Sequence, residues 1–234
     1  MRIFKRKLYE KLLDWKNNRS GRTAVLIEGA RRVGKSTLAR QFAQNEYESY
    51  VMIDFSIVKK DILELFDSIA DLDYFFLQLQ FRLGVSLKER KSLIIFDEVQ
   101  MCPKARQAIK HLVADGRYDY IETGSLISIR KNVKDIVIPS EEEKMVLHPL
   151  DYEEFKWALG DTTTIAQMRM IFEKRLSMGD AVTRKLMRDF RLYMAVGGMP
   201  QAVCEYLETY NLMEVDRVKR GIIQLYEDDF YRID

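Results

Sequence analysis

The sequence has 234 residues, of which 47% are hydrophobic and 32% charged, and these proportions suit one large domain or a core with a smaller attached domain. The few prolines and glycines exclude a disordered chain, and the isolated cysteines and histidines argue against a zinc site or a disulfide framework. The net charge of +2 indicates no particular partner, and the lack of an export signal and of a long apolar run predicts a cytoplasmic protein with no membrane span.

The first predicted element is an amphipathic helix over residues 4–16. Its apolar residues recur three or four positions apart, at Phe4, Leu8, Leu12 and Trp15. The opposite face is basic, and residues 1–40 hold twelve Lys or Arg against three Asp or Glu. This excess is typical of a solvated helix face next to a phosphate site, and the alternative is DNA contact through Lys5, Arg6 and Lys7.

Short apolar runs alternate with helical patterns up to about residue 150. The runs occupy residues 24–27, 50–53, 93–96, 120–122 and 144–147, and the helices between them are expected over 36–45, 61–83 and 103–114. Runs of this length are typical of strands buried on both faces. The alternation predicts an α/β fold, with a parallel sheet covered by helices on both faces.

After Asp151 the pattern changes, because no further strand-like run follows. Helices are predicted over residues 151–159, 164–177, 180–195, 200–209 and 211–227. We therefore expect two domains, a core over residues 1–150 and an all-helical lid over residues 151–234.

The segment between the first apolar run and the next helix is Gly29-Ala30-Arg31-Arg32-Val33-Gly34-Lys35-Ser36. This is the G-x-x-x-x-G-K-S pattern of a phosphate-binding loop, in the strand–loop–helix context that the pattern requires. The glycines let backbone N–H groups curl around a phosphate chain, and the helix N-terminus adds positive potential. We expect Lys35 to reach the β- and γ-phosphates, Ser36 to ligate Mg²⁺ and Thr37 to contact the α-phosphate.

Polar residues follow the third and fourth apolar runs, where ligands meet an open α/β sheet. We expect Asp97 to hold Mg²⁺ and Glu98 to polarise the attacking water, although two carboxylates in this position can also merely cap a strand. At the end of the fourth run, we expect a hydroxyl to contact the γ-phosphate or the water. Ser125 is the preferred residue, and Thr123 is the second choice. Capping of the helix that follows is the alternative role, and the two roles are compatible.

Taken together, these motifs resemble those of the AAA+ superfamily of ATPases. More narrowly, the chain is similar to a group of largely uncharacterised prokaryotic AAA-like ATPases that carry a C-terminal region of unknown function. The matching stretches are residues 29–36, 94–100, 121–125, 148–155 and 197–200. The resemblance implies the strand order 5-1-4-3-2, and it implies that Pro200 of Gly198-Met199-Pro200 packs on the adenine base. Gly197, Gly198 and Pro200 are equally suited to breaking one helix and starting another.

The sequence departs from this group in two places. Members often carry Gly-Arg before the fifth strand, where the arginine can serve as a finger, but residues 140–144 read Ser-Glu-Glu-Glu-Lys. Arg130 and Arg117 are the nearest replacements, and the oligomeric state stays open. The resemblance also implies a further C-terminal region, beyond residue 234, that would define the biological task.

The leading functional hypothesis is Mg²⁺-dependent ATP hydrolysis coupled to movement of the helical lid, with DNA or a protein as the client. The alternative is a nucleotide-gated switch that holds ATP or ADP with slow or no turnover. A small-molecule kinase is a third hypothesis, although kinases more often lack the Asp-Glu pair. A GTPase is least favoured, because the guanine-reading pattern at residues 132–135 has its lysine one position late.

Overall fold

The computed structural model describes residues 2–125 and 141–231, which fall into two compact units. The sheet unit comprises residues 8–30 and 34–147. The helical unit comprises residues 1–7, 31–33 and 148–234. Three residues at the tip of the phosphate-binding loop and the first seven residues of the chain thus group with the C-terminal helices.

Parallel strands form the centre of the sheet unit. Within the described residues they are β1 (Ala24–Gly29), β2 (Ser49–Asp54), β3 (Ser92–Asp97), β4 (Asp119–Ser125) and β5 (Glu142–Val146). Their order is β2-β3-β4-β1-β5, which confirms the order that the family resemblance implied. Because the strands are parallel, the carboxyl ends of β1, β3 and β4 meet at one edge of the sheet, and Gly29 there lies opposite Ser125.

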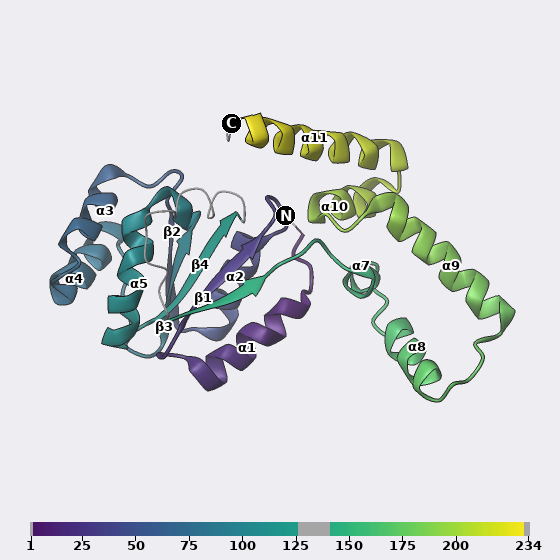
Figure 1. The fold of residues 1–234 in the computed structure, drawn as a ribbon, viewed down its shortest axis with the longest axis horizontal. Helices are drawn as coiled ribbons and strands as arrows, with labels where there is room; N and C mark the ends of the chain where they lie inside the picture. Colours follow the sequence, from purple (N-terminus) through teal and green to yellow (C-terminus); the bar gives the residue numbers. More distant parts are fainter. Residues whose placement is uncertain (1, 126–140, 232–234) are drawn as a thin grey trace. The chain divides into compact units, whose positions relative to one another are not determined.

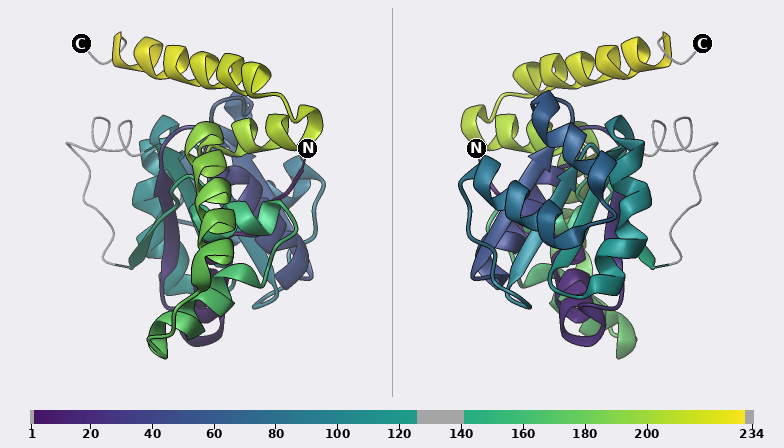
Figure 2. Two further views of the ribbon diagram at one scale, coloured as in Figure 1. Left: turned by 90° about the vertical axis from the view of Figure 1, so that its right-hand side faces the viewer. Right: turned by 90° about the vertical axis from the view of Figure 1, so that its left-hand side faces the viewer.

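Helices cover both faces of this sheet, as the alternating pattern predicts (Figures 1 and 2). One face carries α2 (Lys35–Glu46), with α1 (Lys7–Arg19) beside it, and the rings of Tyr9 and Phe42 join the two helices edge to face. The other face carries α3 (Lys60–Leu65), α4 (Leu72–Leu83) and α5 (Pro103–Asp115). The largest apolar core lies under these three helices and includes the buried rings of Phe66, Phe75 and Phe96. Burial of each such ring contributes about 1.5–3 kcal/mol.

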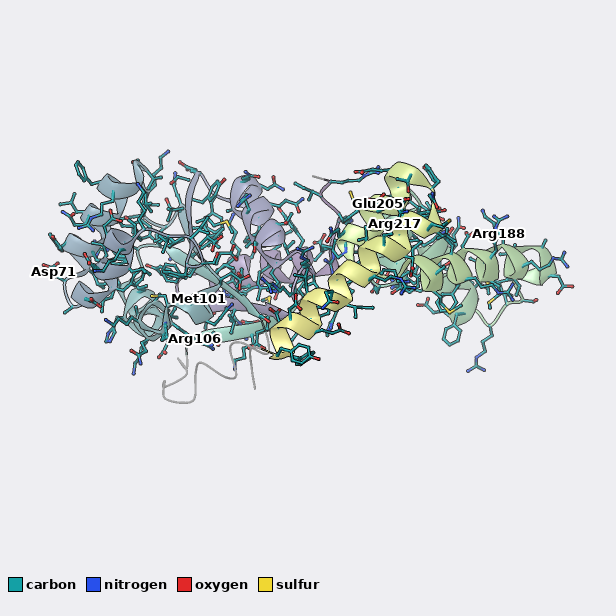
Figure 3. The ribbon with its side chains drawn as sticks, turned by 90° about the horizontal axis from the view of Figure 1, so that it is seen from above. Asp71, Met101, Arg106, Arg188, Glu205 and Arg217 are labelled. Atoms are coloured by element: carbon teal, nitrogen blue, oxygen red, sulfur yellow. The ribbon has the colours of Figure 1, made fainter. Side chains whose placement is uncertain are left out.

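The single helix expected over residues 61–83 is instead two helices joined by a short 3₁₀ turn, Phe66–Ser68. The break has a local cause in Asp71, whose carboxylate accepts a hydrogen bond from the backbone N–H of Tyr74 at 3.0 Å and caps α4 (Figure 3). Phe75 and Phe76 are buried in the core, whereas the neighbouring Tyr74 is 47% exposed.

The helical unit contains, in its described part, α7 (Tyr152–Ala158), α8 (Thr164–Glu173), α9 (Gly179–Val196), α10 (Pro200–Thr209) and α11 (Leu212–Tyr231). These five correspond to the helices predicted after Asp151. Asp151 and Glu154 form a reciprocal capping box that starts α7. A small apolar core joins the helices around Leu150, Phe155 and Val203. None of the helices that the structure describes is both long and apolar enough to cross a membrane.

The two glycines between α9 and α10 have a packing reason. Gly197 adopts a φ of 80°, which favours glycine. A Cβ on Gly198 would lie only 2.0 Å from the carbonyl oxygen of Leu150, whose own N–H donates to the Gly198 carbonyl at 2.7 Å. Close approach of two backbones thus requires glycine here, and Pro200 then starts α10 at a position that suits proline.

A buried charge cluster surrounds Arg106 of α5, whose position is labelled in Figure 3. Arg106 of α5 is 1% exposed, and its Nη2 donates to both carboxylate oxygens of Glu142 at 3.2 Å. Glu122 of β4 is fully buried beside Glu142. Burial, followed by the charge of Glu142, raises the pKa of Glu122 well above its ordinary value.

We expect Glu122→Gln to stabilise the sheet unit above about pH 5. Native Glu122 keeps a proton that the unfolded chain releases above the ordinary glutamate pKa of about 4.3, so the wild type loses stability as pH rises. Glutamine has no such proton to lose, so the variant should show a flatter pH dependence. Urea unfolding from pH 5 to pH 8, followed by Trp15 fluorescence in a Trp157→Phe background, measures this difference. Exposed Glu89→Gln is the control, and parallel curves for wild type and Glu122→Gln would contradict the expectation.

Candidate nucleotide-binding site

The phosphate-binding loop connects β1 to α2 through backbone conformations that fit its glycines. Gly34 has a φ of 95° immediately before α2, and Arg32 at the tip has a φ of 65°. The left-handed conformation has little energetic cost for glycine, whereas for any other residue it costs about 1–2 kcal/mol. The turn brings the loop onto the N-terminus of α2, where the helix N–H groups and the helix dipole favour an anion.

Lys35 is folded into the loop. Its side chain is buried, and its Nζ donates to the carbonyl oxygens of Gly29 at 3.1 Å and Ala30 at 3.0 Å. The ammonium is therefore held inside the curve of the backbone. A phosphate chain that enters this curve meets a fixed positive charge as well as backbone N–H groups.

The structure brings Ser36 and Asp97 together across 61 positions of sequence. Ser36 Oγ, in the first turn of α2, donates to Asp97 Oδ1 at 2.8 Å at the end of β3. The Thr123 hydroxyl, from neighbouring β4, donates to the same carboxylate oxygen. A hydroxyl and a carboxylate side by side are the hard oxygen ligands that Mg²⁺ prefers, so these residues fit the predicted metal.

Glu98 is fixed by its backbone and by a neighbour that the sequence analysis gave no role. It adopts a left-handed conformation with a φ of 52°, and its N–H lies 3.4 Å from the Thr123 Oγ1. The side-chain amide of Gln100, a buried residue in a short 3₁₀ turn, donates to the Glu98 carboxylate. The only sequence signal for this contact was a polar residue two positions after the acid pair.

The two hydroxyls at the end of β4 have different surroundings. Thr123 is fully buried and contacts Asp97, whereas Ser125 is half-buried and lies opposite Gly29 in the strand register. Thr123, the second choice from sequence, is therefore the hydroxyl in direct contact with the acid. Thr37 lies in the first turn of α2 and is half-buried.

The tip of the loop, Arg31 to Val33, makes its contacts within the helical unit. Arg31 Nη1 pairs with Asp229 of α11 at 2.5 Å, and the Arg31 carbonyl accepts from the Tyr226 hydroxyl at 2.7 Å. Arg32 donates to Gln201 of α10 at 2.9 Å. Pro200 also belongs to this unit, and its contact with adenine stays a prediction.

Of the two arginines named as a possible finger, only Arg117 lies within the described residues. Arg117 lies just before β4, at the amino-terminal edge of the sheet, where Asp115 at 2.8 Å and Asp73 at 2.6 Å hold its guanidinium. The guanidinium also lies over the Phe76 ring. Arg130 lies outside the described residues, as does the 132–135 segment compared with a guanine-reading motif.

Two basic N-terminal residues, Arg6 and Lys7, form ion pairs inside the helical unit. Arg6 is buried, with its Nε 3.3 Å from Glu154, and its guanidinium also donates to the Val33 carbonyl at 2.9 Å. Lys7 Nζ lies 2.5 Å from Asp151 and 2.8 Å from Glu153. Two of the three residues considered for DNA contact are thus engaged in ion pairs, so reversing their charge would also disturb packing.

Comparisons with known proteins agree with this geometry. A family model described as "AAA domain" matches residues 21–156, more than half of the chain. The Walker-type ATPase PABY2304 of Pyrococcus abyssi has a similar fold, with a TM-score of 0.57 and 18% identity over 99% of this chain and 77% of that one.

Two further structures are less similar. ORC1 of Aeropyrum pernix, in complex with DNA, gives a TM-score of 0.45 and 12% identity over 68% of this chain and 49% of that one. PCH-2 of C. elegans gives a TM-score of 0.43 and 14% identity over 94% of this chain and 65% of that one. The search of curated proteins found no match. The matched family and the strand order together show that the chain belongs to the AAA domain family of P-loop ATPases, within the AAA+ superfamily.

Proposed function

We propose that this protein binds ATP together with Mg²⁺ and hydrolyses ATP to ADP and phosphate. The observation that carries the proposal is the contact between Ser36 of the phosphate-binding loop and Asp97 of the acid pair at 2.8 Å. Two motifs far apart in sequence therefore meet where a nucleotide phosphate and its metal would lie. Their meeting is what separates this site from an ordinary glycine-rich turn.

Binding would rest on the loop amides, on Lys35 and on the N-terminus of α2. These groups are already in place, because Lys35 is held by two loop carbonyls. Mg²⁺ would be held by Ser36 and Asp97, and its charge would offset that of the phosphate oxygens. Pro200, through the predicted contact with adenine, would add the preference for ATP.

The hydrolytic step needs a base for water, and Glu98 is the proposed one. As the water oxygen bonds to the γ-phosphorus, its proton passes to the Glu98 carboxylate, and the bond to the bridging oxygen breaks to release ADP. Thr123 fixes the position of Asp97, and Gln100 fixes that of Glu98. Catalysis of this kind depends mainly on positioning and electrostatics, which these buried contacts support.

We further propose that hydrolysis is coupled to movement of the helical unit, which would act as a lid. The supporting observation is that Arg31, Arg32 and Val33 of the loop group with this unit and contact α10 and α11. The loop would make different contacts with ATP and with ADP. This difference would shift the conformational equilibrium of the helices that contact the tip of the loop.

A nucleotide-gated switch with slow turnover is the second candidate function, and one observation favours it. The Glu98 carboxylate accepts a hydrogen bond from Gln100. If this contact holds the carboxylate away from the attacking water instead of positioning it, hydrolysis would be slow until the contact breaks.

Steady-state phosphate release tests the two functions. We expect the protein to release phosphate from ATP in the presence of Mg²⁺ and to stop when the metal is chelated. ATP binding with no release would favour the switch, and the absence of both would reject the proposed site.

Gln100→Ala is expected to lower kcat about tenfold while leaving KM for ATP nearly unchanged, because a base that loses its positioning partner is misplaced only for the chemical step. The initial rate of phosphate release over a range of ATP concentrations measures this change. Gln107→Ala, at an exposed position of α5, is the matched control. A rise in kcat would instead show that Gln100 restrains Glu98, as the switch requires.

A further inference from the structure

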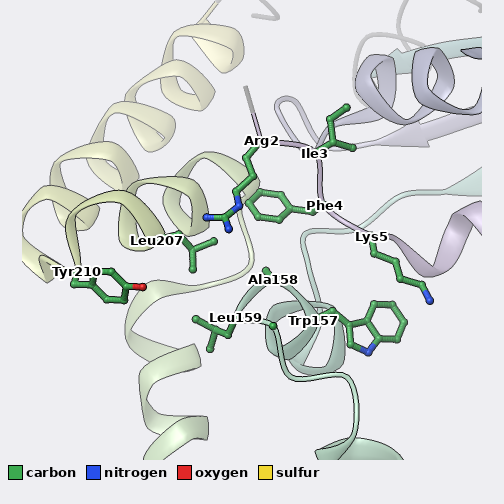
Figure 4. A pocket seen from close by; sticks show the side chains of 10 residues that line it. Arg2, Ile3, Phe4, Lys5, Trp157, Ala158, Leu159, Leu207 and Tyr210 are labelled. Carbon is green, nitrogen blue, oxygen red and sulfur yellow. The ribbon is translucent and has the colours of Figure 1, made fainter.

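The helical unit contains a pocket of about 330 Å³ that plays no part in the proposed hydrolysis (Figure 4). It is formed by the N-terminal segment, the end of α7 and the end of α10. Aromatic and aliphatic side chains make its walls, and they are Phe4, Trp157, Leu159, Leu207 and Tyr210. The volume is at the lower end of the range of about 300–1,000 Å³ for ligand pockets, enough for one or two large apolar side chains.

Two cations lie at this pocket, Arg2 and Lys5, and both are exposed. Figure 4 shows Arg2 on the Leu207 side and Lys5 on the Trp157 side, and Lys5 Nζ lies 4.9 Å from the centre of the Trp157 ring. Within the described part of the chain, neither cation forms an ion pair with a carboxylate. No Asp or Glu is among the residues that line the pocket.

Lys7, two positions after Lys5, has different surroundings. Lys7 pairs with two carboxylates, Asp151 and Glu153, whereas the two pocket cations are exposed and Lys5 lies over the Trp157 ring. The pocket therefore combines aromatic and aliphatic side chains with exposed polar groups and two cations. Two exposed cations attract a negatively charged partner and penalise a positive one.

We propose that this pocket docks a segment of a partner protein in which a large apolar side chain is flanked by Asp or Glu. The apolar side chain would fill the cavity between Trp157 and Leu207, and the acids would pair with Arg2 and Lys5. Trp, Tyr and Arg dominate the energetics of protein interfaces, and all three are present here.

A nucleic acid fits these observations less well. Binding to a phosphate backbone rests on many cations along a track. Here two cations border a single pocket with aromatic and aliphatic side chains, and the acids Asp151 and Glu153 lie only a few positions before Trp157 in the sequence.

Selection from a displayed library of random peptides against the full chain tests the proposal. We expect enrichment of peptides in which Leu, Phe, Met or Trp is next to Asp or Glu. Lys5→Glu and Arg2→Glu should each weaken binding of the best synthetic peptide about tenfold or more, as measured by fluorescence anisotropy. Leu207→Ala should weaken it through the lost apolar contact. Lys185→Glu, an exposed and unpaired lysine in the described part of α9, is the matched control and should have no effect.

ATP hydrolysis by the same variants separates this proposal from the proposed enzymatic function. Arg2 and Lys5 take no part in the nucleotide site, so their variants should hydrolyse ATP as the wild type does, which also shows that they are folded. Enriched peptides that lack acids, or that bind Lys5→Glu as tightly as wild type, would overturn the proposal. A single-stranded oligonucleotide that binds the wild type and is lost in Lys5→Glu, without any selected peptide, would assign the pocket to nucleic acid instead.

Discussion

Replacing Glu98 by glutamine is expected to lower kcat for ATP hydrolysis by about 10²–10⁴-fold, while ATP binding stays close to that of the wild type. Glutamine has nearly the same shape as glutamate, but it cannot accept a proton from water. The binding groups, above all Lys35 and the loop amides, lie in other elements and are unchanged. Phosphate release at saturating ATP measures kcat, and equilibrium binding of a fluorescent ATP analogue measures affinity.

The matched control for this substitution is Glu89→Gln, which makes the same change at an exposed position before β3. It should leave both quantities unchanged. If Glu98→Gln hydrolysed ATP at the wild-type rate, Glu98 would not be the base. If it lost ATP binding as well, the effect would be structural, and the assignment of the base would again fail.

Lys35→Ala is expected to weaken ATP binding about 100-fold or more. A hydrogen bond to a charged group contributes about 1.5–3 kcal/mol, and a loss of about 2.7 kcal/mol corresponds to a 100-fold change in Kd. The substitution removes the ammonium that the Gly29 and Ala30 carbonyls hold inside the loop. Equilibrium titration with the same fluorescent analogue gives the change in Kd.

Lys35 is buried, so folding must be checked alongside affinity. Thermal unfolding of Lys35→Ala, followed by circular dichroism, shows whether the sheet unit persists. Lys11→Ala, at an exposed position of α1, is the control that removes a lysine away from the loop. A folded Lys35→Ala variant with wild-type affinity for ATP would contradict the placement of phosphate in this loop.

The phosphate-binding loop was predictable because its signal is local. Its glycines, lysine and serine are contiguous, and the buried run before it and the helix after it are visible in the same short stretch. The proximity of Ser36 and Asp97 was also predictable, because parallel strands deliver their carboxyl ends to one edge of the sheet. The strand order followed from the family resemblance, since spacing alone does not decide which strands pair.

Other features of the site and the fold depend on three-dimensional geometry that the periodicity of the sequence does not predict. Both β4 hydroxyls point to the same face of a strand, so sequence could not tell that Thr123, rather than Ser125, contacts Asp97. The Gln100 contact arises because Glu98 leaves β3 in a left-handed conformation, which is uncommon for glutamate. The break in the helix expected over residues 61–83 depends on Asp71 acting as a cap rather than as a surface acid.

Long-range ion pairs involve part of the basic N-terminus, and composition alone does not reveal them. Arg6 meets Glu154 and Lys7 meets Asp151 across more than a hundred positions, and composition shows only the excess of positive charge in the first segment. Arg2 and Lys5 belong to the same basic segment and lie at the pocket of the helical unit. No sequence motif indicated this pocket.

Calorimetric titration of the wild-type protein with ATP tests the central claim most directly, namely that the loop and the acid pair together hold a magnesium nucleotide. We expect a clear binding heat in the presence of Mg²⁺ that weakens when the metal is chelated, and a smaller dependence on the metal in Ser36→Ala. Titration of a folded protein with ATP and Mg²⁺ that gives no heat at any temperature tried would contradict the claim.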